Sequence, residues 1–373
     1  MTRQHAELRR RLADELVDAG LLGPRWLPSF LDVERHAFIP DTVWLSDPDR
    51  TDGADLVPLR RGDDPPAWLD LVYRNTHVVT QVDDGRPAGP GGRGMVATSS
   101  SSQPSVMALM LTALDAEPGH RVLEVGAGTG YNAALLAHRV GAANVTTVDI
   151  DPLVAAAAAA SLAAAGFGEV TVVTGDGELG HPAGAPYDRV ICTAGVRDVP
   201  YEWVRQTRPG GRIVAPWSTL LYDGGVLTLT VRDDGSADGR LTDRVAFMPL
   251  RGQRVLPAIP DDLGAAGVTA RTTGCHPDAV LRDPGALLAV GLRVPRCRRS
   301  SGPSGAVCLV DRWSRSWAVV RPSRSGTTVH QHGPRNLWDE VEDVHHWWLD
   351  AGSPPADRWL ITITPTAQTT VLT

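Results

Sequence analysis

The sequence predicts an α/β fold: a doubly wound, mostly parallel sheet with a helical cap before it and an α+β extension after it. Residues 121–125 alternate in apolar character like a short buried strand, and glycines at 126, 128 and 130 then lead into an Ala- and Leu-rich helix. A second β-branched run, residues 144–149, ends in an acid, and strands and helices continue to alternate to residue 216. Such alternation is typical of a parallel sheet with right-handed crossovers.

The first 95 residues are predicted to form a cap of helices and loops. Residues 4–19 carry leucines at helical spacing, and a second short helix is expected over residues 28–33. Residues 47–66 are rich in Asp, Arg, Gly and Pro, which favours a long surface loop. A strand is expected over residues 76–80, followed by a Gly- and Pro-rich insertion over residues 84–94.

The core of the fold is expected over residues 96–249. It opens with a serine-rich segment, residues 97–105, before a helix for which Ser102 is suited as N-cap and Pro104 as a first-turn residue. The remaining predicted elements are helices at 153–165 and 203–207, strands at 170–174, 187–193 and 211–216, and a hairpin of residues 225–232 and 241–248.

Residues 250–373 are predicted to form a small α+β extension with a role in peptide recognition. Strand-like runs at 306–320 and 359–364 flank a predicted helix at 336–349, whose tryptophans lie on or near one face. Tryptophans on such a stripe more often fill a core than bind a ligand.

Composition excludes several classes of function. The chain of 373 residues has a formal net charge of −7, which argues against a general nucleic-acid binder. The four cysteines lie far apart with no C-x-x-C pair, so no zinc or other metal site is predicted and reduced thiols are expected. The charged N-terminus has no apolar signal core, and no run of about 18 apolar residues occurs. These features predict a cytoplasmic protein that does not bind membranes; they leave its oligomeric state open.

The glycine turn and the acid after it predict a nucleoside-containing cofactor. Glycines at a strand-to-helix turn let a ligand lie against bare backbone, with helix N–H groups aimed at it. Asp149, at the end of the second strand, is placed where a carboxylate accepts hydrogen bonds from ribose hydroxyls. The alternative is an ordinary βαβ unit in which Asp149 caps the following helix, since Asp151-Pro152 also resembles a helix start.

Several phrases of the sequence together resemble one enzyme family. They are His36-Ala-Phe-Ile-Pro40, Ser-Ser-Gln-Pro-Ser-Val-Met-Ala at 101–108, the strand, glycine turn and helix at 121–137, Gly-Asp-Gly at 175–177, and Pro-Gly-Gly-Arg-Ile-Val at 209–214. Over about residues 30–220 the chain is similar to protein-L-isoaspartate O-methyltransferases. The serine phrase followed by the glycine turn distinguishes that family from other class I (Rossmann-like) methyltransferases, which share only the turn.

The resemblance implies S-adenosyl-L-methionine as cofactor and S-adenosyl-L-homocysteine as product. Asp149 would take the ribose hydroxyls, Asp176 the adenine amino group, and Glu124 the cofactor's amino group, although Glu124 is equally well interpreted as a solvated acid at a strand end. The implied cofactor-binding residues are Glu124, Gly126, Ala127, Gly128, Thr129, Gly130, Asp149, Ile150, Asp176 and Gly177.

The same resemblance places the acceptor beside the serine phrase. Ser102 matches the family's serine and is the predicted catalytic residue, with Ser101 beside it; the alternative is that Ser102 only caps the helix. The predicted substrate-binding residues are Ser100, Gln103, Arg74 and His77. Residues 73–80 and the insertion at 84–94 depart from the family's usual sequence, and this departure puts activity on arbitrary damaged proteins in doubt.

The extension, with the phrases at 247–251 and 334–339, resembles a branch of the family associated with ATP-grasp peptide maturases, which make graspetides. That resemblance implies methyl esterification of an aspartate in a ribosomal precursor peptide already cyclised by an ATP-grasp ligase, and collapse of the ester to an aspartimide. The alternative is the general repair enzyme acting on isoaspartyl residues. A third hypothesis is a cofactor-binding, peptide-recognising subunit without turnover.

Overall fold

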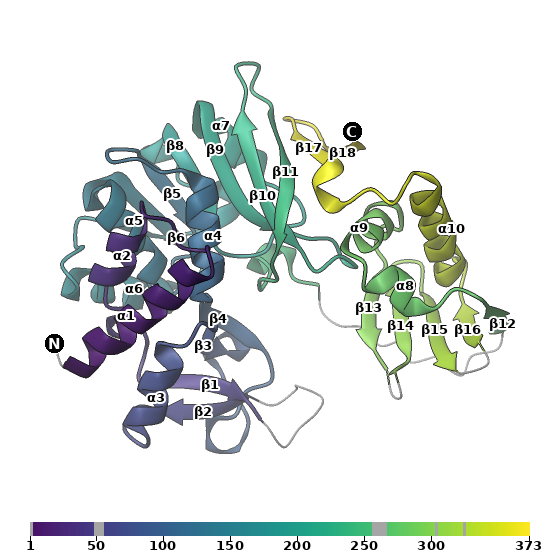
Figure 1. Ribbon diagram of the computed structural model, residues 1–373, viewed down its shortest axis with the longest axis horizontal. Helices are drawn as coiled ribbons and strands as arrows, with labels where there is room; N and C mark the ends of the chain where they lie inside the picture. Colours follow the sequence, from purple (N-terminus) through teal and green to yellow (C-terminus); the bar gives the residue numbers. More distant parts are fainter. Residues whose placement is uncertain (1–2, 48–55, 256–266, 303–304, 324–325) are drawn as a thin grey trace.

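The computed structural model describes residues 3–47, 56–255, 267–302, 305–323 and 326–373, which form three β-sheets with helices around them (Figure 1). A four-stranded sheet follows the N-terminal helices, a nine-stranded sheet forms the centre, and a five-stranded sheet lies in the C-terminal part. Within this part of the chain, no helix is both long enough and apolar enough to cross a bilayer.

The N-terminal region combines three helices with an antiparallel sheet in the order β2-β1-β3-β4. Its elements are α1 (Arg3–Asp18), α2 (Leu27–Asp32), β1 (Thr42–Ser46), β2 (Leu56–Arg60), α3 (Pro65–Val72), β3 (Val78–Val82) and β4 (Ala97–Ser101). The expected loop at 47–66 is therefore wrong over β2, which is an edge strand of its sheet, and edge strands tolerate a proline such as Pro58. Residues 48–55 of that prediction lie outside the described residues. The first part of the serine-rich segment, for which no strand was predicted, is strand β4.

The central sheet has the order β18-β17-β11-β10-β9-β8-β5-β6-β7. Its strands are β5 (Val122–Val125), β6 (Val145–Asp149), β7 (Thr171–Thr174), β8 (Tyr187–Cys192), β9 (Thr207–Trp217), β10 (Gly225–Val231), β11 (Ala237–Arg244), β17 (Trp359–Ile363) and β18 (Gln368–Leu372). Strands β5 to β9 pair in parallel, and β9, β10, β11, β17 and β18 pair in antiparallel. The predicted doubly wound sheet with an antiparallel end is confirmed. Its strand order reverses at β5, where such sheets bind ligands.

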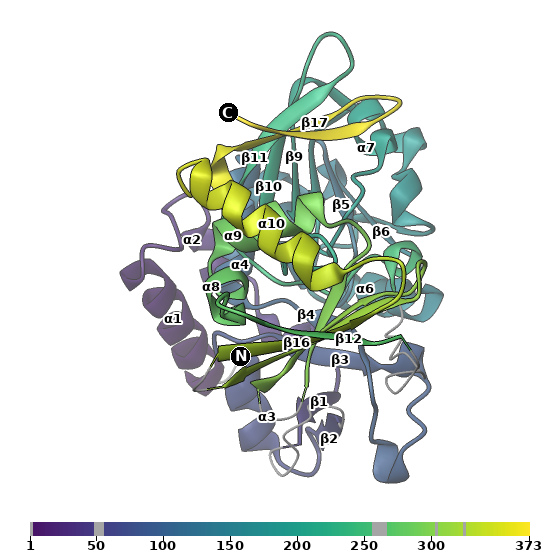
Figure 2. The same ribbon diagram turned by 90° about the vertical axis from the view of Figure 1, so that its right-hand side faces the viewer.

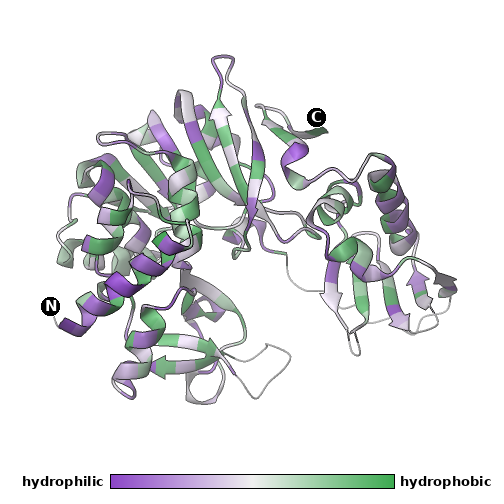
Figure 3. Cartoon of the chain, in the orientation of Figure 1, coloured by the Kyte–Doolittle hydropathy of each residue, from purple (hydrophilic) through white to green (hydrophobic). Residues whose placement is uncertain are grey.

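Both faces of the parallel strands are buried, which explains their near-continuous apolar runs. Val190 of β8 and Ile213 of β9 belong to one apolar core, and their neighbours Ile191 and Val214 belong to the other. The surrounding helices are α4 (Pro104–Leu114), α5 (Tyr131–Val140), α6 (Pro152–Ala164) and α7 (Tyr201–Arg205). Figure 3 shows the hydrophobic residues concentrated along these strands and on the helix faces turned toward them.

The C-terminal region is an antiparallel sheet in the order β12-β16-β15-β14-β13, with helices over one face (Figure 2). Its elements are β12 (Thr269–Thr273), α8 (Pro277–Leu281), α9 (Pro284–Arg293), β13 (Arg298–Ser301), β14 (Val307–Asp311), β15 (Ser316–Ser323), β16 (Gly326–His332) and α10 (Leu337–Asp350). Trp338 and Trp348 of α10 are buried in this core, as the stripe predicted. The chain then returns to the central sheet as β17 and β18, so the region expected as one extension also contributes two strands to the core.

Candidate active site

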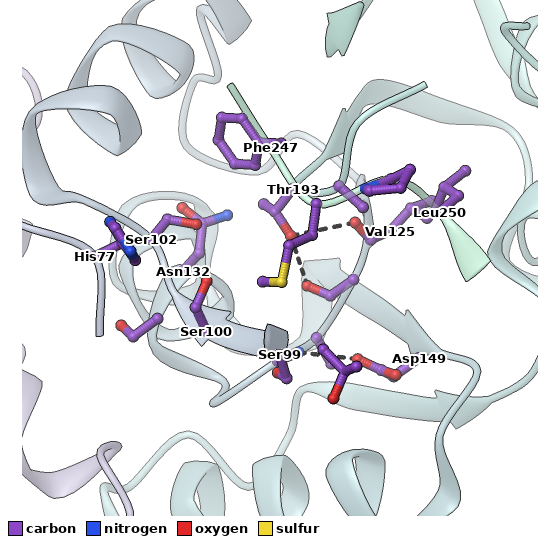
Figure 4. A pocket seen from close by; sticks show the side chains of 18 of the residues that line it. His77, Ser99, Ser100, Ser102, Val125, Asn132, Asp149, Thr193, Phe247 and Leu250 are labelled. Carbon is purple, nitrogen blue, oxygen red and sulfur yellow. Dashed lines mark hydrogen bonds between the residues drawn. The ribbon is translucent and has the colours of Figure 1, made fainter. Parts of the chain in front are cut away.

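A cavity of about 710 Å³ lies at the carboxyl ends of the parallel strands, within the size range of small-molecule sites. Its walls are the turns that follow β5, β6, β7 and β8, together with strand β4, the start of α4 and residues 244–252. Figure 4 shows Ser100, Ser102 and Asn132 on one side of it, Thr193 and Val125 on the other, and Phe247 above them. The reversal point of the sheet and the serine segment therefore share one hollow.

The glycine turn forms the floor of the cavity. Gly126, Gly128 and Gly130 have φ angles of +97°, +52° and +84°, and the first and last of these are strained for any residue with a side chain. A Cβ on Gly126 would also lie 2.7 Å from the Thr193 hydroxyl oxygen, so the turn has no room for one. Ala127 and Thr129 line the cavity with Gly126 and Gly128, and α5 begins directly after the turn. Gly130 does not line it, which corrects its predicted cofactor contact: a Cβ there would lie 3.2 Å from the Ala158 carbonyl oxygen, so this glycine packs against α6 instead.

Asp149 lines the cavity at the tip of β6, and its carboxylate is held by backbone amides. One oxygen accepts from the Gly128 N–H at 3.0 Å and the other from the Asp151 N–H at 3.0 Å. Burial raises the pKa of Asp149, and these two hydrogen bonds oppose that rise. The helix cap is Asp151, which accepts from the Leu153 and Val154 amides. The alternative role of Asp149 as the cap is therefore wrong.

Glu124 does not reach the cavity, which corrects both of its predicted roles. Its side chain is fully buried behind the turn, where it accepts hydrogen bonds from the Asn132 amide at 2.7 Å and the Thr147 hydroxyl at 2.6 Å. Burial raises the pKa of Glu124 to about 7, although both hydrogen bonds favour the charged form. Because Asn132 does line the cavity, Glu124 acts by positioning that amide.

The turn after β7 supplies the remaining predicted cofactor residues. Asp176 lines the cavity and accepts from the Glu178 N–H at 3.0 Å. A Cβ on Gly177 would meet a Val125 methyl carbon at 2.4 Å, so only glycine lets this turn pack against the end of β5. Ile150 also lines the cavity, with 40% of its surface exposed.

The serine segment approaches the glycine turn directly. A Cβ on Gly128 would lie 3.6 Å from the Ser100 carbonyl oxygen. Ser100, Ser101, Ser102 and Gln103 all line the cavity. The cap of α4 is Gln103, without a side-chain cap bond, so the predicted capping role of Ser102 is wrong.

Within the described residues the Ser102 hydroxyl makes no hydrogen bond, which leaves it free to bind a ligand. The Ser101 hydroxyl is buried and lacks a hydrogen-bond partner in the same part of the chain. Of these two hydroxyl groups, that of Ser102 is therefore the one accessible to a ligand beside the glycine turn.

Arg35, which sequence reasoning missed, holds the serine segment in place. Its guanidinium is fully buried and donates to the carbonyl oxygens of Val72, Arg74, Thr76 and Ser102 at 2.7–3.2 Å. Burial lowers the pKa of Arg35 to about 10, so it remains charged at neutral pH. The only signal in the sequence was its position directly before the His36–Pro40 phrase.

Of the two predicted basic substrate contacts, one lines the cavity and the other does not. His77 is exposed and lines the cavity next to Ser102 (Figure 4). Arg74 does not line it: it follows α3, and its side chain forms an ion pair with Asp70 of that helix, four residues earlier in the chain. An exposed pair at that spacing is satisfied locally, which corrects the prediction that Arg74 contacts the substrate.

The glycine-rich insertion meets the far wall of the cavity through charges. Asp84 pairs with Arg254 at 2.8 Å and with Arg251 at 3.3 Å, and both arginines line the cavity. Arg251 also lies 3.2 Å from Asp151. The insertion is thus attached to the segment that enters the C-terminal region, a contact between residues 170 positions apart that no local pattern predicts.

The comparisons with known proteins agree with this geometry. A sequence model of the family described as protein-L-isoaspartate (D-aspartate) O-methyltransferase matches residues 91–255. A protein-L-isoaspartate O-methyltransferase from Hyperthermus butylicus is 32% identical over 257 residues, which are 66% of this chain and 90% of the relative. The chain is also 33% identical over 248 residues to one from Methanopyrus kandleri, covering 66% of this chain and 92% of the relative.

A solved structure named protein-L-isoaspartate O-methyltransferase aligns with 98% of this chain and 99% of its own, with a TM-score of 0.57 and 22% identity. At that identity the likeness is one of fold. It confirms the class I methyltransferase fold predicted from the sequence. Because the alignment covers 98% of this chain, it includes the C-terminal region. That region is therefore part of the fold that the two proteins share.

Proposed function

The chain belongs to the protein-L-isoaspartate O-methyltransferase family, and we propose that it transfers a methyl group from S-adenosyl-L-methionine to the side-chain carboxylate of an isoaspartyl residue in a protein or peptide. One observation carries the proposal: a glycine turn with strand-end acids and a segment with unused serine hydroxyls face each other across a single cavity. Of the narrower hypotheses, this general activity is the one that the relatives' names favour.

The residues present fit the cofactor. The floor of the cavity is bare backbone at Gly126 and Gly128, and the adjacent turn excludes any side chain at Gly177. Asp149 would hold the ribose hydroxyls and Asp176 the adenine amino group, which are donors suited to carboxylate acceptors. When bound, the cofactor supplies an electrophilic methyl group on a sulfonium.

The acceptor needs positioning more than activation. A carboxylic acid with a pKa near 4 is already ionised at neutral pH, so no general base is required. The Ser102 hydroxyl would donate to the carboxylate oxygen that does not attack, and Arg35 fixes the Ser102 backbone for that role. Phe247 and Leu250 line the cavity and keep water from the attacking oxygen. Orientation of this kind supplies on the order of 7–11 kcal/mol in favourable systems.

Methyl transfer to a synthetic isoaspartyl peptide, with its normal aspartyl twin as control, tests the proposal. Mass spectrometry should detect the gain of one methyl group on the isoaspartyl peptide alone. Ser102→Ala should lower kcat/KM by about tenfold or more while leaving the cofactor Kd unchanged. Ser101→Ala is the matched control, because it removes a neighbouring buried hydroxyl, and its effect should be smaller. Cofactor binding without any methyl transfer would instead favour the non-catalytic subunit.

The specialised hypothesis is a second candidate: esterification of an aspartate in a cyclised ribosomal precursor peptide, followed by aspartimide formation. It is supported by the insertion at 84–94, which departs from the family's usual sequence and reaches the cavity wall through Asp84. A linear isoaspartyl peptide and a precursor cyclised by an ATP-grasp ligase discriminate the two. Methylation of only the cyclised peptide, with later loss of methanol, would replace the general reaction by the specialised one.

A further inference from the structure

One stretch of the C-terminal region has a net positive charge, although the chain as a whole is negatively charged. Residues 284–323 contain seven arginines and a single acid, Asp311, whereas the chain as a whole has a formal net charge of −7. Arg296, Arg312 and Arg315 of this stretch are exposed, and none of them forms an ion pair within the described residues. Exposed charges of one sign without partners favour an oppositely charged ligand.

An exposed tryptophan lies among these arginines. Trp313 is 51% exposed, and the guanidinium carbons of Arg296 and Arg312 lie 5.8 Å and 5.4 Å from its ring centroid. Tryptophan and arginine are the residues most enriched at the energetic centres of protein interfaces. We name Arg296, Arg312, Trp313 and Arg315 the Trp313 patch.

The turn that carries the patch is held firmly by its own buried acid. Asp311 is 2% exposed, and its carboxylate accepts from the Trp313 amide at 2.9 Å and the Ser314 hydroxyl at 2.7 Å. Arg335, from the segment before α10, forms an ion pair with Asp311 at 2.8 Å and a second one with Glu340. Asp311 is therefore buried below the turn and bound to its own partners, so its carboxylate is not exposed on the surface of the patch.

Strands β13 and β14 join the patch to the cavity. Arg298 at the start of β13 donates to the Val255 carbonyl oxygen at 2.8 Å, directly after the cavity-lining Arg254. The register pairs Arg298 with Val310, so Arg296 and Arg312 lie at the same end of the sheet as this attachment. The patch is thus on the end of the C-terminal sheet that is tied to the wall of the candidate active site.

We propose that the Trp313 patch binds an acidic segment of the polypeptide substrate, at a distance from the residue that is methylated. This inference rests on the proposed function, which makes the ligand a polypeptide. A nucleic acid is disfavoured because the chain is acidic overall. Backbone or side-chain apolar groups of the segment would pack on Trp313 while its carboxylates meet the three guanidiniums.

Two isoaspartyl peptides that differ only in a glutamate-rich or a glutamine-rich tail test the proposal. The native enzyme should have a KM about tenfold lower for the glutamate tail, and added salt should remove the difference. Trp313→Ser and the double change Arg312→Ser with Arg315→Ser should abolish that preference and leave kcat and KM for a tail-less peptide unchanged. Because these side chains are exposed, circular dichroism should be native for both variants.

Arg321→Ser is the matched control. It removes an exposed arginine from the opposite end of β15, about 17 Å from Ser316 at the strand's rise per residue, and should keep the preference. Equal KM values for the two tails in the native enzyme, or an equal loss in Arg321→Ser, would overturn the proposal. So would a single-stranded oligonucleotide that displaces the labelled glutamate tail more readily than the unlabelled peptide does.

Direct binding separates this proposal from the proposed function. Anisotropy of the labelled glutamate-tail peptide needs no methyl transfer. Binding that depends on Trp313 and the arginines, without turnover of any isoaspartyl peptide, would keep the patch and remove the proposed reaction. Turnover without tail-dependent binding would do the reverse.

Discussion

Replacement of Glu124 by glutamine should change how the stability of the protein depends on pH. Burial raises the pKa of this carboxyl from its ordinary 4.5 to about 7, so between these values the folded protein holds a proton that the unfolded chain releases. The contribution of Glu124 to the free energy of unfolding is therefore largest below pH 4.5. It falls as the pH rises from 4.5 to about 7 and reaches its lowest value above that pH. A shift of this size corresponds to about 3 kcal/mol.

Glutamine is neutral at every pH and fits the same hydrogen bonds, since its oxygen can accept from Asn132 and its amide can donate to the Thr147 hydroxyl oxygen. Urea unfolding followed by tryptophan fluorescence, on native protein and Glu124→Gln without cofactor, measures the effect. From about pH 4.5 to pH 8 the native protein should lose about 2–3 kcal/mol relative to the variant. Parallel pH profiles for the two proteins would refute the assignment of a neutral buried carboxyl.

Three further changes test other parts of the site. Gly177→Ala adds a Cβ 2.4 Å from a Val125 methyl carbon, and should weaken binding of S-adenosyl-L-homocysteine by about tenfold in calorimetry; unchanged affinity would contradict the close packing. Arg35→Gln leaves buried carbonyl oxygens unpaired, so it should lower the free energy of unfolding in urea by about 3 kcal/mol and also lower kcat/KM. Native values for both would show that the hydrogen bonds of Arg35 are not needed to hold the serine segment. Asp84→Ser removes an exposed ion pair with Arg254 and should change stability by under about 1 kcal/mol while raising the peptide KM; an unchanged KM would separate the insertion from substrate binding.

The parts of the fold that the sequence predicted are those written in local patterns. The strand, glycine turn and helix at 122–140 follow from residues adjacent in the chain, and so does the position of Asp149 at the end of its strand. Helix α10 follows from its apolar stripe. Strands β2 and β4 were missed because proline, arginine and serine give no strand signal, and what stabilises them is pairing with β1 and β3.

The corrections within the site have one physical cause: a side chain's partners are set by the tertiary fold. Arg35 binds carbonyl oxygens 37–67 residues away, which no spacing in the sequence announces. Glu124 has the strand-end position of a ligand-binding acid, yet its side chain points to the opposite side and meets Thr147. Arg74, conversely, pairs with Asp70 of the helix that precedes it. Which face of a strand meets the ligand depends on packing that only the folded chain provides.

The path of the last strands explains how a distant patch can serve the active site. The central sheet is left after β11 and is joined again by β17, which pairs with β11 from Ala237 to Arg240. The near end of the C-terminal sheet is also attached through Arg298 and Val255. These two attachments restrict the distance between the Trp313 patch and the serine segment. A single flexible linker would allow that distance to vary. A substrate bound at the patch therefore presents its reactive residue to the cavity at a higher effective concentration, which is the condition for a second contact to lower KM.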